Sequence, residues 1–317
     1  MAFAVSSQQT RGLEEFILED LNTFTRIIIL PEHGGLLNGF EVRHLHGTVN
    51  ILDNYIDRHA LEEGIEKSFK GAKLSPYPCR ITEGTYEIDG RKLSFSNEGG
   101  KLPAIHGLLY NKVFSEVGHF CDDYQASLHL KYNYNREDPG YPFEYRCELL
   151  YTLFPGNILL LQTTIINLDS NSIPLADGWH PYFTLGGNVN DWYLRFQSDF
   201  MVELGDNLVP TGRLLSYNTF ETAQAIGNTE FDNCFLLTAK VSSAACILFN
   251  PVNKLSVSFF PGESYPYLLI YTPPGRQSIA IENVSAPPDC FNNKMGLLML
   301  APGHSKTFSI YYKIGSE

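Results

Sequence analysis

Hydrophobic and polar residues alternate with a period of two along much of the chain. Between Gln125 and Tyr132, apolar residues occupy every second position and polar residues fill the positions between them. The stretch from Tyr145 to Leu153 repeats this pattern, and so does the run from Phe308 to Ile314. A period of two is typical of a strand with one face buried and the other in solvent. The pattern therefore predicts half-buried β-strands in all three stretches.

A tight hairpin is predicted around Asp89-Gly90. Both residues readily adopt the positive φ angles of a two-residue loop, which sets Tyr86 opposite Leu93. The only stretch with a plausible helical pattern is 54–69, and we expect Gly64 to interrupt that helix.

Strand signals dominate, and the 26 glycines and 18 prolines are scattered between apolar runs as strand punctuation. They predict an all-β fold, a large twisted antiparallel β-sandwich. A chain of 317 residues could form two average domains. Because neither a linker rich in Pro, Gly or Ser nor an internal repeat divides it, we expect a single domain over residues 1–317.

Composition and charge exclude some classes of partner. The formal charge of −12 argues against nucleic acid, since phosphate binding needs a surplus of Lys and Arg. The N-terminal segment lacks the features of a signal peptide, and no apolar run is long enough to cross a membrane. We expect a soluble, cytoplasmic protein whose six cysteines are buried free thiols: Cys79, Cys121, Cys147, Cys234, Cys246 and Cys290.

The strongest local signal for chemistry is the segment Gly178–Phe183. Pro181 keeps His180 out of the helical conformation, so the imidazole is presented from an extended segment among aromatic residues. An imidazole can donate a proton near neutral pH. For a histidine considered alone, packing in an aromatic core is the more common explanation.

Several motifs resemble, in order, those of the aldose 1-epimerases, also called galactose mutarotases. The run Trp179–Phe183 resembles the His-Pro-Tyr-Phe signature of that family. The other matching segments are Cys79-Arg80-Ile81, Asn97-Glu98, Ile105-His106-Gly107, Gly140-Tyr141-Pro142, Phe231–Phe235, Ile281-Glu282-Asn283 and Ala301-Pro302-Gly303. The resemblance extends from about residue 25 to the end. Two positions depart from it: Cys79 stands where the family usually has Asn, and Leu108 where it has a second Gly.

The resemblance implies a galactose mutarotase-like supersandwich that interconverts the α and β anomers of a hexose such as glucose or galactose. Glu282 would be the base on the anomeric hydroxyl and His180 the acid on the ring oxygen, on opposite sides of the sugar. Arg80, His106 and Asp232 would bind the sugar. The implied partner is a small-molecule sugar, the implied assembly a monomer or homodimer, and no metal or cofactor is implied.

The residues by themselves support these roles unevenly. Glu282 follows an apolar run, where a carboxylate is costly to bury unless it is hydrogen-bonded or used. Asp232 could equally form a turn before Asn233, and Arg80 could form a surface ion pair. We expect all five side chains to line one open cleft containing several aromatic rings, with Trp179 or Tyr182 close to the imidazole.

Two other histidine motifs are expected to carry no chemistry. His33-Gly34-Gly35 spells the family's His-Gly-Gly, but it precedes the first hairpin, so we expect turn glycines and an exposed His33. His44 and His46 would share one face of a strand. Without a third ligand nearby, a solvated face is expected there rather than a metal site.

Three alternatives remain open. A hexose-6-phosphate epimerase of the same fold would need several Lys or Arg around C6 of the sugar. A carbohydrate-binding protein without activity would keep the aromatic residues and Arg80 but would need neither His180 nor Glu282. A glycoside hydrolase would use Asp232 and Glu282 as its two carboxylates.

Overall fold

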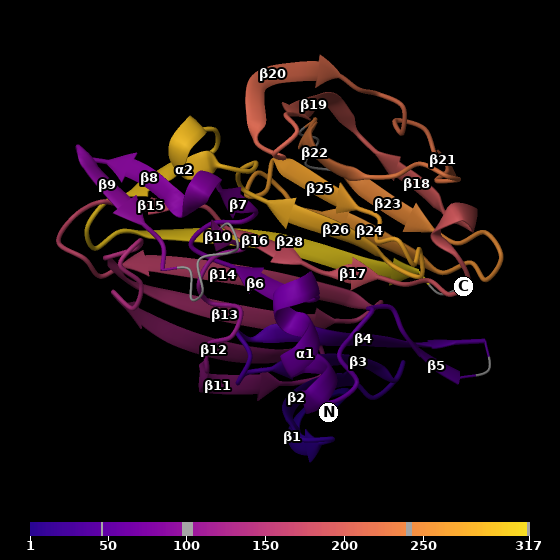
Figure 1. Cartoon of the computed structure of the whole chain (residues 1–317). Helices are drawn as coiled ribbons and strands as arrows, with labels where there is room; N and C mark the ends of the chain where they lie inside the picture. The colour runs from indigo at the N-terminus through magenta and orange to yellow at the C-terminus, as the bar shows by residue number, and fades with distance from the viewer. Residues whose placement is uncertain (46, 97–103, 239–242, 316–317) are drawn as a thin grey trace.

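A computed structural model describes residues 1–45, 47–96, 104–238 and 243–315, so the Asn97-Glu98 pair and His46 lie outside the described residues (Figure 1). Strands dominate, and every pairing between named strands in these ranges is antiparallel. The all-β prediction is confirmed. Nothing in the structure tests the single-domain expectation, which stays a prediction.

Three large sheets contain most of the strands. The five-stranded sheet follows chain order: β1 (Phe3–Thr10), β2 (Leu13–Asp20), β3 (Thr25–Leu30), β4 (Leu36–His44) and β5 (Gly47–Asn50). The nine-stranded sheet has the spatial order β11 (Ser115–Cys121), β12 (Ala126–Asn135), β13 (Glu144–Phe154), β14 (Ile158–Asn167), β28 (Ser305–Gly315), β24 (Ser256–Phe260), β23 (Cys246–Phe249), β18 (Tyr193–Phe196) and β21 (Gln224–Ala225). The eight-stranded sheet has the order β20 (Pro210–Ser216), β19 (Ser198–Leu204), β22 (Asp232–Leu237), β25 (Tyr267–Tyr271), β26 (Ile279–Val284), β16 (Gly178–His180) and β6 (Ala72–Leu74), with β17 (Tyr182–Phe183) also paired to β26.

Smaller elements connect the sheets. The strand pairs are β7 (Arg80–Ile81) with β10 (Ala104–Ile105), β8 (Thr85–Ile88) with β9 (Arg91–Ser94), and β15 (Ile173–Leu175) with β27 (Leu298–Leu300). The helices are α1 (Arg58–Ser68), α2 (Cys290–Asn293) and the 3₁₀ turns η1 (Thr82–Gly84) and η2 (Val189–Asp191). Neither α-helix in the described ranges is long and apolar enough to cross a membrane.

The three predicted strands are confirmed as β12, β13 and β28. In β13, the apolar residues of the alternation are buried, while Arg146, Glu148 and Leu150 between them are half-buried. In β28, the buried positions likewise alternate from Phe308 to Ile314. Figure 1 shows β28, in yellow, between the magenta strands β11–β14 and the orange strands of the C-terminal half.

The two largest sheets pack face to face. Phe183 of β17 contacts Phe259 of β24 and Tyr312 of β28, with ring centroids 5.0 and 5.7 Å apart. All three rings are buried. The contact between inner faces is the packing expected of a β-sandwich.

The predicted hairpin and helix have different outcomes. The hairpin β8–β9 is confirmed, with Tyr86 paired to Leu93 and a loop of two positive-φ residues. The helix α1 is continuous, so the prediction that Gly64 interrupts it was wrong. A Cβ on Gly64 would lie 2.9 Å from the Tyr55 ring, and the glycine therefore serves close packing rather than a break.

The six cysteines are free thiols, as expected. Five are buried, but Cys121 is only half-buried, because it ends β11 at the edge of the nine-stranded sheet.

Candidate active site

Glu282 lies on β26, in the interior of the eight-stranded sheet. All six residues of β26 are buried. Ile279 and Ile281 belong to the main core between the large sheets, whereas Val284 packs in a second apolar cluster beside α1. Because strand residues alternate in direction, Glu282 projects to the same side as Val284, away from the main core. Its exposure is only 3%.

The register of β26 brings His180 opposite Glu282. Position 179 pairs with 283, and position 182 pairs with 280, so position 180 meets 282 across the two strands. Opposed side chains of antiparallel strands have Cβ atoms about 4.5–5.5 Å apart. His180 Nε2 accordingly approaches Glu282 Oε1 to 3.3 Å, with both side chains buried.

Aromatic packing fixes the His180 ring. Tyr182 stacks on the imidazole with ring centroids 5.2 Å apart and an angle of 4° between the planes. Trp179 packs on the other side of the strand, where Lys73 Nζ lies 4.7 Å from its ring. Of the two aromatic residues expected near the imidazole, Tyr182 is the one in contact.

His106 is directed toward the same place by a tight turn. It follows β10 with a φ of 61°, which is uncommon for a residue with a Cβ. A Cβ on the next residue, Gly107, would lie 2.3 Å from the Ser75 carbonyl oxygen, so only glycine fits. The imidazole packs against the rings of Phe69 and His180, each with centroids 4.7 Å away.

Backbone geometry explains one of the two departures from the family's motifs, Leu108, but not the other, Cys79. Leu108 lies outside the left-handed region, so a second glycine is not required there. Cys79 has a φ of 57°, a conformation that Asn tolerates better than most residues. Cys79 is buried, and it lines a cavity, described below, that is also lined by His106 and His180.

Arg80 and Asp232 each begin a strand at the rim of this cavity. Arg80, on β7, is half-buried, and Asp232, on β22, is exposed. Although the Asp232 side chain is exposed, partial desolvation by its surroundings raises the pKa of its carboxyl. The nearby Arg80 cation acts in the opposite direction and lowers this pKa. Strand β25 separates β22 from β26, which places Asp232 two strands from Glu282.

One cavity of about 370 Å³ is lined by all five predicted site residues: Arg80, His106, His180, Asp232 and Glu282. Small-molecule sites commonly measure about 300–1,000 Å³, so this one can hold a single sugar ring. Phe69, Tyr182 and Tyr271 add aromatic surface. This matches the expected combination of several rings with a few polar groups.

The motifs in the sequence did not identify the remaining walls. They come from the last turn of α1, from Tyr271 on β25, and from Leu204 and Leu208 near the β19–β20 hairpin. Tyr271 pairs with Asp232 across strands that lie about 40 residues apart in the chain. A strand pattern could have identified Tyr271 as half-buried, but only the pairing shows which residue it faces.

Burial shifts the acid–base groups toward their neutral forms. It raises the pKa of Glu282 well above the usual 4.5, and the Asp232 carboxylate adds to this. It lowers the pKa of His180 to about 3. It also lowers the pKa of His106 well below 6.5, with His180 and Arg80 acting in the same direction. These shifts favour a protonated Glu282 beside two neutral imidazoles.

The His180–Glu282 contact corrects one expectation. At 3.3 Å the two groups leave no room for a sugar between them, so they cannot act from opposite sides. The anomeric oxygen and the ring oxygen of a pyranose are bonded to the same carbon. Two adjacent groups on one wall can therefore reach both oxygens.

The same side chains could hold a metal ion. One nitrogen or oxygen atom from each of His106, His180 and Glu282 lies within 4.8 Å of the other two. Two imidazoles and one carboxylate form a ligand set found in zinc enzymes. The motifs in the sequence did not suggest this arrangement.

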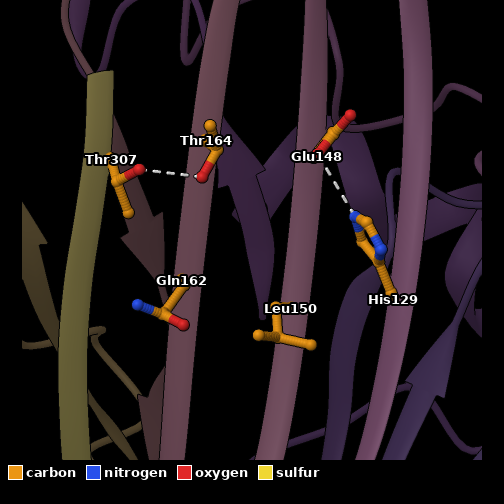
Figure 2. A pocket seen from close by; sticks show the side chains of 6 residues that line it. All are labelled: His129, Glu148, Leu150, Gln162, Thr164 and Thr307. Atoms are coloured by element: carbon orange, nitrogen blue, oxygen red, sulfur yellow. Dashed lines mark hydrogen bonds and ion pairs between the residues drawn. The ribbon is translucent and has the colours of Figure 1, made fainter. Parts of the chain in front are cut away.

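A second cavity, of about 280 Å³, lies on the outer face of the nine-stranded sheet (Figure 2). It contains another histidine–carboxylate pair, with His129 Nε2 3.3 Å from Glu148 Oε2. Thr164 and Thr307 form a hydrogen bond of 2.9 Å across β14 and β28. Among the described residues, its walls contain no Phe, Tyr or Trp side chain.

The two histidine motifs set aside earlier need correction. The glycines after His33 form a turn, as expected, but His33 itself is half-buried rather than exposed. It lies in the turn between β3 and β4, close to packed backbone. His44 is buried at 7% exposure and not on a solvated face.

Known proteins resemble this chain in sequence and in fold. The family model for aldose 1-epimerase matches residues 25–313. The chain belongs to the aldose 1-epimerase family. A curated relative, the uncharacterized protein YihR of Escherichia coli (strain K12), is 26% identical over 249 residues, which cover 76% of this chain and 78% of YihR.

Solved structures share the fold of this aldose 1-epimerase family member. A galactose mutarotase-like protein from Clostridium acetobutylicum superposes with a TM-score of 0.86 at 19% identity, covering 100% of this chain and 99% of the other. Galactose 1-epimerase from Lactobacillus acidophilus NCFM gives a TM-score of 0.80 at 18% identity, covering 99% and 98%. At these identities the likeness shows the fold.

Proposed function

We propose that the protein is a mutarotase acting on a neutral aldohexose such as glucose or galactose, with Glu282 and His180 as its acid–base pair. The observation that carries the proposal is the buried 3.3 Å contact between these two groups inside a cavity large enough for one sugar ring. Membership of the aldose 1-epimerase family supports an isomerase of this type.

In the proposed reaction the pair shares one proton, which rests on Glu282 in the empty cavity and passes to His180 across the 3.3 Å contact before the sugar reacts. Glu282 takes the proton of the anomeric hydroxyl as His180 gives one to the ring oxygen, and the bond between C1 and the ring oxygen breaks. Rotation about the C1–C2 bond then presents the other face of the aldehyde. Ring closure runs the two transfers in reverse, so the pair regains its starting state without a hydride or an external proton donor.

His106, Arg80 and Asp232 are proposed to hold the sugar. Arg80 donates hydrogen bonds, and Asp232 accepts them at the rim. His106, packed between two rings, would bind near the ring oxygen or its neighbouring hydroxyls.

Charge around the cavity favours a neutral sugar over a 6-phosphate. Among the described lining residues, the cations Lys67 and Arg80 are matched by the acidic residues Glu66 and Asp232, and the raised pKa of Glu282 favours its neutral form, so the cavity has no surplus of positive charge. A dianionic phosphate would need a surplus of Lys and Arg. The phosphorylated substrate therefore remains the second candidate.

Polarimetry of freshly dissolved sugars tests the proposal. We expect Glu282→Gln to slow the mutarotation of the preferred aldohexose by about 10²–10⁴-fold, the usual contribution of an acid–base group, with a much smaller change in sugar affinity. The matched control is Glu148→Gln, which removes a carboxylate held 3.3 Å from a histidine outside the cavity and should leave the rate unchanged.

The competing functions give different results in the same assay. A binding protein would show sugar affinity without acceleration, a 6-phosphate epimerase would accelerate only phosphorylated sugars, and a hydrolase would release free sugar from a glycoside. If the wild-type protein accelerates mutarotation of no common aldose, the mutarotase proposal is wrong.

A further inference from the structure

The cavity combines sugar-sized space with a compact set of metal-ligating side chains. We propose that, in the absence of sugar, it binds one Zn²⁺ ion through His106, His180 and Glu282. We also propose that the ion and the sugar exclude each other. The binding of the ion can be measured without any substrate, whereas its effect on the rate rests on the proposed mutarotase function.

The distances are close to those of a zinc site. His180 Nε2 and Glu282 Oε1 are 3.3 Å apart. Ligand atoms around a tetrahedral Zn²⁺ are also about 3.3 Å apart, given bonds of about 2.0–2.2 Å to the metal. The His106 ligand atom lies within 4.8 Å of the other two, so a small shift of the imidazole toward the pair completes a three-ligand site.

The side-chain atoms available also suit a transition metal. His106 Nδ1 and Glu282 Oε2 are buried without a hydrogen-bond partner among the described residues. Such atoms lose the hydrogen bonds that water would give them, and a metal ion restores a strong partner. Imidazole ligands favour Zn²⁺ over Mg²⁺ or Ca²⁺, which prefer oxygen ligands.

The surroundings hold the ligands and admit a cation. Phe69 packs on His106, and Tyr182 stacks on His180, so both rings keep their positions near the cavity. The positive charge of Arg80 opposes a cation there. Among the described lining residues, Glu66 and Asp232 offset it, and Glu282 would give up its proton to bind the ion as a carboxylate.

Ion and sugar would compete for the same atoms. The proposed acid–base reaction uses the nitrogen and oxygen of His180 and Glu282 that would bind Zn²⁺. A metal-bound pair has no free lone pair with which to take the anomeric proton. Zn²⁺ is therefore expected to inhibit mutarotation competitively with the sugar.

Calorimetry on the tag-free, EDTA-treated protein tests the site with Zn²⁺ alone. We expect one ion per chain, and an affinity that falls about tenfold or more in His106→Gln, which loses one of three ligands. His129→Gln is the matched control. This variant removes a histidine that also lies 3.3 Å from a carboxylate. Because His129 belongs to no three-ligand group in the described parts of the chain, the Zn²⁺ affinity of the variant should match that of the wild type.

Equal loss of affinity in both variants, or binding far below one ion per chain, would overturn the proposal. Circular dichroism shows whether His106→Gln is folded. If the variant is not folded, the visible absorption spectrum of Co²⁺ added to the wild-type protein tests the site instead. A spectrum identical to that of Co²⁺ in buffer would rule the site out.

A saturating concentration of the sugar that the protein turns over should weaken Zn²⁺ binding, and an unchanged Zn²⁺ affinity would disprove the mutual exclusion of ion and sugar. A metal-free protein that fails to accelerate mutarotation refutes the proposed function but not the metal site.

Discussion

Two histidine–carboxylate pairs in this chain have the same separation and different surroundings. In both, Nε2 lies 3.3 Å from a carboxylate oxygen, but the His180 side chain is 7% exposed and that of His129 is 35% exposed. A buried pair cannot rely on water to stabilise its charges, which shifts its proton equilibria. Burial, rather than distance, therefore distinguishes the candidate catalytic pair at the scale of single residues.

The pH dependence of the rate follows from this burial. The working pair holds one proton. The pair takes up a second proton only when His180 is protonated, and the pKa of His180 is about 3. It loses its single proton only above the raised pKa of Glu282. We expect kcat/KM, corrected for spontaneous mutarotation, not to decline as the pH falls from 7 to 5, because His180 takes up its second proton only near pH 3. A decline centred near pH 6.5, the ordinary value for histidine, would contradict this.

The stability of Glu282→Gln should depend on pH in a defined direction. Below pH 4.5 the carboxyl is protonated in both the folded and the unfolded chain, so burial carries no charge penalty. As the pH rises through 4.5, the unfolded chain ionises first, and the wild type loses stability until the raised folded pKa is passed. We expect the variant to be more stable than the wild type by about 1 kcal/mol at pH 7, and equally stable near pH 4.

Urea unfolding at the two pH values measures the difference. The Glu148→Gln variant, whose carboxylate lies on the outer face of the sheet, serves as the control and should show no such trend. A Glu282→Gln variant that is less stable than the wild type at pH 7 would show that the carboxylate is stabilised by contacts in the folded protein.

At the scale of elements, α1 depends on a glycine that helix propensity alone would disfavour. Replacing an interior Gly by Ala usually stabilises a helix by about 0.5–1 kcal/mol. At Gly64 the new methyl group would lie 2.9 Å from the buried Tyr55 ring. We therefore expect Gly64→Ala to destabilise the protein by about 1–3 kcal/mol, measured by thermal unfolding. The neighbouring Glu63→Ala, at an exposed position, should change stability by less than about 0.5 kcal/mol.

Local pattern was sufficient for some elements and not for others. The alternation in β13 and the Asp89-Gly90 turn are properties of short segments, and both were predicted correctly. The role of Gly64 depends on a ring nine positions away, and that of Tyr271 on a strand that is distant in sequence. The five site residues could be named because family motifs mark them. The direct contact between His180 and Glu282 could not be predicted, since it follows from the pairing of β16 with β26.

At the scale of the whole molecule, an ion pair lies inside the core between the large sheets. Lys73 Nζ is 2.5 Å from Asp177 Oδ1, both side chains are fully buried, and Tyr265 donates a hydrogen bond of 2.7 Å to the same oxygen. Removing one partner leaves an uncompensated buried charge, whereas replacing both with apolar residues removes the charge entirely.

We therefore expect Lys73→Met or Asp177→Leu alone to lower the free energy of unfolding by about 3–5 kcal/mol, and the double variant to lower it much less. A thermodynamic cycle from urea unfolding measures the coupling. Additive losses in the double variant would show that the two side chains contribute independently.

The position of β28 has a consequence for the newly made chain. Ser305–Gly315 lies between β14 and β24, in the interior of the nine-stranded sheet, although it follows every other strand of that sheet in the sequence. Until the ribosome has released this segment, two half-sheets present unpaired edges to each other and to other nascent chains. Such edges readily recruit foreign strands. Translation of this protein thus passes through an interval, after β24 and before β28, in which these two edges are open to foreign strands, and the interval closes when a single strand inserts.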